Sequence, residues 1–196
     1  MKLVLASKNK KKLAEMQEIL SALGVEVVLQ AEVGVDVDVE ETGTTFAENS
    51  ALKARAVCAA SGLPAIADDS GLCVDALNGA PGVYSARYGG EGLDDVGRYQ
   101  LLLQNMRGQP DRRCGFVSAI CCAFPNGDEI TAMGECRGTL AYAPRGEQGF
   151  GYDPIFFVPE KKKTFAELTG EEKNEISHRG KALAAFKEEL ERYLNT

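Results

Sequence analysis

Apolar residues in the first third of the chain alternate between strand-like and helix-like spacing. A short strand is expected at 3–6, followed by apolar residues at helical spacing that end at a glycine, and then by a second strand at 25–29. The sequence Thr45-Phe46-Ala47-Glu48 is a capping box, which predicts a helix up to Ala60 before a strand at 65–67. This order predicts β-α-β units with parallel pairing of the early strands.

The middle and the end of the chain carry a different pattern. The stretch 115–124 is largely apolar, and Asn126-Gly127 then predicts a tight turn into a second strand at 129–135. Three further elements are expected, namely a helix at 93–106, a strand at 155–158 and a helix after Ser177. The last helix has one apolar stripe, made of Leu183, Phe186, Leu190 and Leu194. The pattern predicts an α/β protein whose mixed sheet is parallel early and antiparallel in the middle.

Composition limits the classes of protein to which the chain can belong. Its 196 residues favour a single domain over 1–196. The net charge of −7 argues against binding to nucleic-acid polymers or to anionic membranes. No apolar stretch approaches the roughly 20 residues that span a bilayer, and the N-terminal apolar run is too short for a signal peptide. A cytoplasmic location is therefore expected.

Six cysteines are present, but none forms a C-x-x-C pair, and the chain has one histidine. A zinc site is disfavoured, because such sites need four closely placed cysteine and histidine ligands. Free, buried cysteines in a reducing compartment are the simpler interpretation.

Two adjacent carboxylates, Asp68 and Asp69, follow the short apolar run 64–67. At the end of a buried strand they would repel each other and lose hydration, and a divalent cation relieves both costs. Glu40 and Glu41 precede a helix cap and could complete a carboxylate cluster, although such loop acids are often only solvated. Magnesium usually takes one or two carboxylates together with water and phosphate oxygens, so not all four need to be ligands.

A lysine-rich segment joins the first strand to the first helix. It consists of Ser7, Lys8, Asn9, Lys10, Lys11 and Lys12. Backbone amides and the dipole at a helix N-terminus attract phosphate, and lysines add charge that reaches polyphosphate oxygens. The glycines of a Walker A loop are missing, and a solvated lysine-rich turn is the alternative. Ser70, after the two aspartates, could bind a phosphate or cap a turn.

Two further segments have features of a base-binding site. The first contains Phe150, Gly151, Tyr152 and Asp153. Its glycines allow close approach of the backbone, and aromatic rings stack on bases, whereas the aspartate could equally stabilise a turn before Pro154. The second contains Lys173, His178 and Arg179. Histidine and arginine can donate hydrogen bonds to ring carbonyl oxygens, although a lone histidine is more often structural.

In this order the segments resemble the family of inosine/xanthosine triphosphate pyrophosphatases, the bacterial non-canonical purine NTP pyrophosphatases. The resemblance covers nearly the whole chain, and the ordered set of motifs is far more specific than any one of them. The motifs are Ser7-x-Asn9-x-x-Lys12, Glu40-Glu41-Thr42-Gly43, Phe46-x-Glu48-Asn49, Lys53-Ala54-Arg55, 67–72, 79–88, 149–157 and 172–180.

The resemblance implies an elongated mixed sheet flanked by helices, two lobes with a central cleft, and a homodimer. It also implies hydrolysis of dITP, ITP and XTP to the monophosphate and pyrophosphate. The hydrolysis would proceed by magnesium-assisted attack of water at the α-phosphorus. The reaction would remove deaminated purines from the nucleotide pool.

The resemblance also implies roles for individual residues. The segment 7–12 and Lys53 would hold the triphosphate, and Ser70 would touch the substrate. Glu40 and Asp69 would hold magnesium, with Asp68 and Glu41 as further candidates, and Asp69 would accept the proton of the attacking water. The residues 150–153 would flank the base, and its recognition would be completed by Lys173, His178 and Arg179.

Two rival functions use part of the same pattern. A Maf-like nucleotide pyrophosphatase would handle other nucleotides, and the complete base-side set argues against it. A nucleotide sensor would need the phosphate and base segments but no carboxylate pair, so Asp68 and Asp69 disfavour it.

Overall fold

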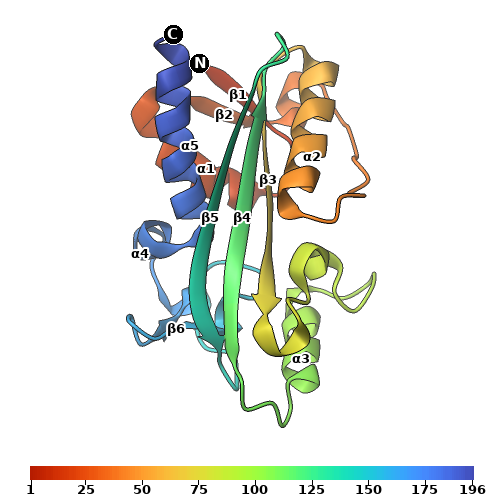
Figure 1. Cartoon of the computed structure of the whole chain (residues 1–196), viewed down its shortest axis with the longest axis vertical. Helices are drawn as coiled ribbons and strands as arrows, with labels where there is room; N and C mark the ends of the chain where they lie inside the picture. Colours follow the sequence, from red (N-terminus) through yellow and green to blue (C-terminus); the bar gives the residue numbers. More distant parts are fainter. The chain divides into compact units, whose positions relative to one another are not determined.

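A computed structural model describes residues 1–196 as a mixed α/β fold in which helices flank a seven-stranded sheet (Figure 1). The strands are β1 (Lys2–Leu5), β2 (Glu26–Leu29), β3 (Ala65–Val74), β4 (Arg113–Ala123), β5 (Glu129–Leu140), β6 (Phe156–Val158) and β7 (Lys163–Thr164). Their order in the sheet is β2-β1-β3-β4-β5-β6-β7. β1 pairs in parallel with β2 and β3, whereas β6 pairs antiparallel with β5 and β7. The predicted mixed sheet is therefore confirmed.

Five α-helices accompany the sheet. They are α1 (Lys10–Leu20), α2 (Phe46–Ser61), α3 (Asp95–Asn105), α4 (Gly170–Ile176) and α5 (His178–Leu194). Six 3-10 helices lie at 21–23, 30–33, 75–77, 82–87, 153–155 and 165–167. The predicted capping box starts α2, because Thr45 Oγ1 accepts the Glu48 amide while the Glu48 carboxylate accepts the Thr45 amide. None of the helices is long and apolar enough to cross a membrane.

Two compact units make up the chain, each with its own core. Unit 1 contains 1–69, 118–134 and 178–196, and unit 2 contains 70–117 and 135–177. In unit 2 the rings of Phe116, Phe156 and Phe165 form the centre of the core, with centroids 4.6 to 5.6 Å apart. Compact units are not the same as functional domains, so the single domain expected over 1–196 stays a prediction.

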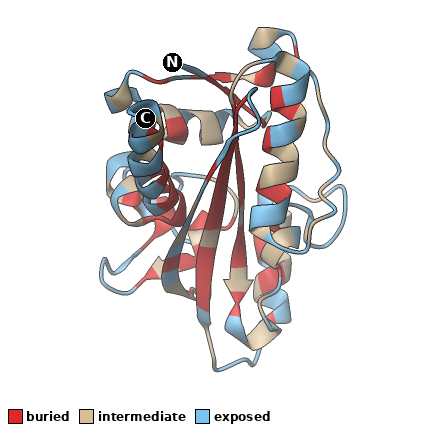
Figure 2. Ribbon diagram, turned by 45° about the horizontal axis from the view of Figure 1, so that its top comes forward, coloured by how far each residue is buried: buried red, intermediate tan, exposed pale blue.

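The sheet of unit 1 is covered on both faces because its strands alternate. Leu3 and Leu5 point towards α1 and α5, whereas Val4 points towards α2. The same alternation in β3 puts Ile66 on the first face and Ala65 on the second. In Figure 1, α1 and α5 lie on one side of the strands and α2 on the other. Figure 2 shows that β3 and β4 are buried over most of their length.

Two expectations about the elements were wrong, and one helix was not anticipated. β3 continues to Val74, so Asp68 and Asp69 lie inside the strand rather than at its end. The strand continues because each carboxylate meets cationic side chains, and because apolar residues follow at 72–74. α4 was not predicted, since its seven residues carry no apolar period, and Leu194 is 55% exposed instead of completing the stripe of α5.

Gly134 in β5 allows α5 to approach the sheet closely. A Cβ atom at this position would lie 2.2 Å from the carbonyl oxygen of His178 and 2.5 Å from the amide nitrogen of Ala182. Both atoms belong to the backbone of α5, so no side-chain rotation would relieve the clash.

We expect Gly134→Ala to lower the free energy of unfolding by about 1–3 kcal/mol, the usual cost of overpacking. Urea denaturation at equilibrium measures this change. Thr131→Ala, at an exposed position of the same strand, is the control and should change stability by less than about 0.5 kcal/mol. Equal stability of the two variants would contradict the importance of this close approach.

Candidate active site

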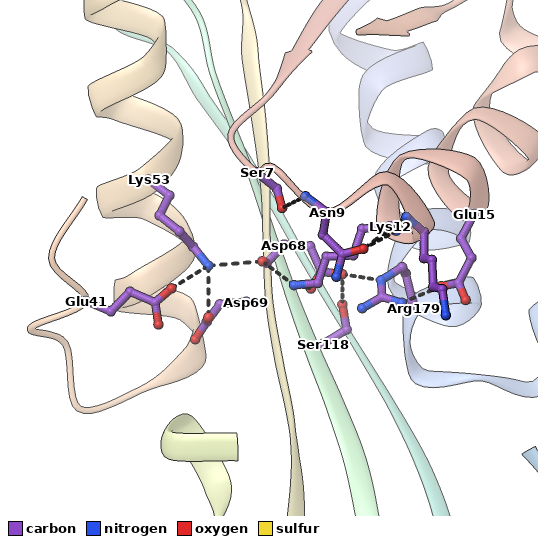
Figure 3. A network of polar contacts seen from close by, with 11 residues as sticks. Ser7, Asn9, Lys12, Glu15, Glu41, Lys53, Asp68, Asp69, Ser118 and Arg179 are labelled. Atoms are coloured by element: carbon purple, nitrogen blue, oxygen red, sulfur yellow. Dashed lines mark hydrogen bonds and ion pairs between the residues drawn. The ribbon is translucent and has the colours of Figure 1, made fainter. Parts of the chain in front are cut away.

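The Asp68 carboxylate is the centre of a buried polar network on the α1 and α5 side of the sheet (Figure 3). Its side chain is fully covered, and the residue is 2% exposed. Oδ2 accepts hydrogen bonds from Arg179 Nε at 2.6 Å and from Ser118 Oγ at 3.1 Å, and Oδ1 accepts one from Lys12 Nζ at 3.2 Å. Arg179 is also paired with Glu15. Because two cations already neutralise Asp68, it is a poor candidate for a metal ligand.

The charges of this network are held by mutual pairing. Burial by itself disfavours the charged guanidinium of Arg179, but Asp68 and Glu15 outweigh it and raise the pKa of Arg179. For Lys12, burial is the larger effect and lowers the pKa, although the charge of Asp68 opposes it. Removing the Asp68 carboxylate would therefore take one carboxylate from Arg179, leaving it paired with Glu15, and would deprive buried Lys12 of its carboxylate partner.

Asp69 lies on the opposite face of β3, where α2 provides its partner. Lys53 Nζ donates hydrogen bonds to Asp69 Oδ1 at 2.9 Å, to Glu41 Oε1 at 3.1 Å and to the carbonyl oxygen of Asp68 at 3.1 Å. All three donors of the ammonium group are thus used. Burial alone would lower the pKa of Lys53, but the two carboxylates outweigh it and the pKa is raised.

The second oxygen of Asp69 is the exceptional atom of the site. Asp69 is 6% exposed, yet its buried Oδ2 has no hydrogen-bond partner. Burial raises the pKa of Asp69, and Lys53 opposes this shift only in part. An uncompensated buried carboxylate oxygen is costly, so the site fits a cation or a polarised water.

Only part of the predicted carboxylate cluster comes together. Glu41 shares Lys53 with Asp69, whereas Glu40 is exposed and forms no ion pair. No group of three or more His, Cys, Asp or Glu side chains is close enough to hold a metal ion. A magnesium ion here would therefore need water or phosphate oxygens in addition to protein ligands.

The lysine-rich segment is organised by its own polar side chains. Ser7 Oγ accepts the Asn9 amide at 3.0 Å, and Asn9 caps α1 by accepting the amides of Lys11 and Lys12 at 3.0 and 3.2 Å. Lys10 and Lys11 are exposed, and Lys8 forms an exposed ion pair with Asp36 at 2.9 Å. A pocket of about 450 Å³ beside this segment is lined by 7–8, 29–31 and 34–36.

A second group of predicted residues comes together in unit 2. The buried Lys173 Nζ donates to Asp153 Oδ2 at 2.8 Å, and the same oxygen accepts the Phe150 amide at 3.1 Å. The ammonium group also lies 5.0 Å from the centre of the Phe150 ring. Gly149 has a φ of +72°, and a Cβ there would lie 2.0 Å from Asp153 Oδ2, so this position requires glycine.

The remaining predicted residues lie on β3 and α5. Ser70 is half-buried in β3, and His178 is buried at the start of α5. Sequence reasoning missed Glu15 and Ser118 as partners in the Asp68 network. Glu15 lies one helical turn after Lys12, but nothing in the sequence indicates that it pairs with a residue of α5.

A model of the Ham1 family matches residues 3–189. The chain belongs to the Ham1 family. It is 49% identical over 185 residues to the dITP/XTP pyrophosphatase of Gluconobacter oxydans, covering 94% of this chain and 88% of that protein. It is 46% identical to a solved HAM1 protein from Coxiella burnetii, with a TM-score of 0.89 and coverage of 98% and 99%. It is 42% identical to the solved Ham1 protein of Staphylococcus aureus, with a TM-score of 0.88, and the match covers 98% of this chain and 100% of that one. The predicted family is confirmed.

Asp68 and Asp69 should differ in their effect on the stability of this Ham1-family chain. Asp68→Asn leaves buried Arg179 poorly compensated, so we expect a loss of about 3–5 kcal/mol. Asp69→Asn keeps an oxygen for Lys53 and should be as stable as the wild type or more stable at pH 7. Thermal and urea unfolding measure both.

The raised pKa of Asp69 determines how the stability effect of Asp69→Asn changes with pH. The native state holds this proton more tightly than the unfolded chain, so stability is lost as the pH rises from the ordinary pKa of 3.8 to the folded one. Any advantage of Asp69→Asn should therefore be full above the folded pKa and vanish below the ordinary one. A large loss of stability in Asp69→Asn at pH 7 would contradict this assignment.

Proposed function

We propose that this chain hydrolyses non-canonical purine nucleoside triphosphates, namely dITP, ITP and XTP, to the monophosphate and pyrophosphate. The observation that carries the proposal is the buried, unpartnered Oδ2 of Asp69 next to the Lys53 ammonium group. Such an oxygen can accept a proton from water, and the neighbouring cation can bind phosphate. Curated relatives about half identical over nearly the full length are named dITP/XTP pyrophosphatases.

In the proposed mechanism, lysines neutralise the triphosphate. In this structure each of three lysines forms an ion pair with a carboxylate, namely Lys8, Lys12 and Lys53. Phosphate oxygens would replace some of these partners, and the remaining residues of the segment 7–12 would add hydrogen-bond donors. Ser70 would contribute a hydroxyl to the substrate. This arrangement stabilises negative charge that develops on the phosphoryl oxygens and on the departing pyrophosphate.

Asp69 would take the proton of the attacking water. In the absence of a metal ion, burial raises the pKa of Asp69, and Oδ2 has no competing donor, so this oxygen is available to a water molecule. We propose Mg²⁺ as the cofactor, held by Asp69 with Glu41, whereas Glu40 is the ligand that the sequence resemblance favours. When bound, Mg²⁺ supplies further neutralisation of charge on the phosphate oxygens.

Base selectivity would depend on hydrogen-bond donors. Asp153 keeps Lys173 paired and oriented beside Phe150, and Lys173 would donate to the 6-oxo group. Adenine presents a 6-amino group, which would leave a buried donor unpaired at a cost of roughly 1–3 kcal/mol. Gly151 and Tyr152 would flank the base. Guanine would be refused at its 2-amino group by a pocket wall or an unpaired donor.

We further propose a homodimer that acts in the cytoplasm on free nucleotides rather than on nucleic-acid polymers or membranes. All six cysteines are free, which is typical of a reducing compartment, and the net charge of −7 disfavours binding to polyanions. A single functional domain over 1–196 belongs to the same proposal. Light scattering of the purified protein tests the dimer.

Pyrophosphate release from dITP, XTP, dGTP and dATP tests the reaction directly. We expect release from dITP and XTP to exceed release from dATP and dGTP by roughly 10- to 100-fold, as one unpaired buried donor predicts. EDTA should abolish it. Release of orthophosphate would move the cleavage to a terminal phosphate, and no turnover of any substrate would favour a Maf-like enzyme or a sensor.

The matched pair Glu41→Gln and Glu40→Gln identifies the glutamate that assists the metal. The variant that lacks a metal ligand should need a higher Mg²⁺ concentration for half-maximal release, while the other should behave as the wild type.

Asp69→Asn should lower kcat by about 10²- to 10⁴-fold, the usual contribution of a general base. Binding should persist, because the phosphate-binding lysines remain. Turnover by stopped assay and XTP binding by calorimetry in the presence of Ca²⁺ measure the two effects separately. Unchanged turnover would refute the role of Asp69 as the base.

A further inference from the structure

The loop 149–153 is held by two buried anchors. Asp153 pairs with Lys173 inside unit 2, and the hydroxyl of Tyr152 donates to the carbonyl oxygen of Ser85 at 2.6 Å. Ser85 belongs to the segment 79–88, which the sequence analysis singled out and the proposed mechanism does not use. The segment 79–88 therefore holds the loop in place through Tyr152, and it forms part of the fold of unit 2.

The tip of the loop is a tight turn. The Asp153 amide donates to the carbonyl oxygen of Phe150 at 3.2 Å, which closes four residues. Gly151 has a φ of +61°, and Tyr152 has a φ of −85° and a ψ of 4°. Glycine adopts positive and negative φ with similar ease, so the turn by itself does not fix the peptide between Phe150 and Gly151.

A third anchor fixes that peptide. The Gly151 amide donates to Asp95 Oδ2 at 2.9 Å, and Asp95 is the first residue of α3. Asp95 is exposed, unlike Tyr152, Asp153 and Lys173, so it adds little to the core. It does not cap α3 either, because Asp94 has that task and accepts the Gly97 amide at 2.8 Å. Its hydrogen bond therefore acts on the loop.

We propose that Asp95 is a positioning residue for base recognition, which holds the Phe150–Gly151 peptide in the one orientation that places the Phe150 ring for stacking. This inference rests on the proposed function, since it assumes that the loop 149–153 meets the base. The hydrogen bond orders the loop before the nucleotide arrives. Without it, part of the binding free energy must order a glycine-containing turn.

Asp95→Ala tests the proposal. We expect KM for dITP to rise about 3- to 10-fold with kcat changed less than about twofold, because the phosphate chemistry is untouched. Asp95→Asn should restore KM, since its amide oxygen still accepts the Gly151 amide. Hydrogen exchange of the Gly151 amide should become at least about fivefold faster in Asp95→Ala and return towards the wild-type rate in Asp95→Asn.

Asp94→Ala is the matched control on the same helix. It removes the cap of α3, so it should lower the melting temperature and leave KM unchanged. Wild-type KM and wild-type Gly151 exchange in Asp95→Ala would overturn the proposal, as would a KM of Asp95→Asn equal to that of Asp95→Ala. If the wild type hydrolyses no nucleotide, the proposed function fails, while the exchange experiment still decides whether Asp95 orders the loop.

Discussion

The rest of unit 1 depends on one buried ion pair, between the carboxylate of Asp68 and the guanidinium of Arg179. It joins residues 111 positions apart and fixes the start of α5 to the middle of β3. Lys12 brings α1 to the same carboxylate, so a single side chain sets the positions of three elements. The lysine-rich segment and the central strand are placed by this pairing before any ligand is considered. A buried pair of this kind is costly to break, which makes the geometry around it well defined.

The alternation of β3 separates two roles that look alike in the sequence. Asp68 and Asp69 are neighbours, but their side chains point to opposite faces, and each meets its own cations. Asp68 has its charge neutralised and serves the fold. Asp69 retains an unpartnered oxygen, to which the proposed mechanism assigns the proton transfer. The mutual repulsion expected from their adjacency is thus avoided by the pleat of the strand rather than by a shared metal ion.

The parts of the fold that depend on local spacing could be predicted from the sequence. The first β-α-β unit, the capping box at Thr45 and the turn at 126–127 involve residues close together in the chain, and all three are present. Long-range pairing could not be predicted. The guanidinium of Arg179 pairs with Asp68 and Glu15, and nothing in the local sequence indicates either partner. The end of β3 was misplaced for the same reason, since a polar residue ends a strand only if no distant partner compensates it. The signature motifs identified the family because their order is specific, although they do not state which contacts each residue makes.

The pleat of β3 also limits how this gene can change in length. Losing or gaining one codon between Ala65 and Asp68 would exchange the faces of the two aspartates, so that the paired carboxylate would meet Lys53 and the unpartnered one would meet Arg179. Both the fold and the site would be lost in one event. Viable insertions and deletions must therefore fall in the connecting loops, and the number of residues in this strand is constrained as tightly as their identity.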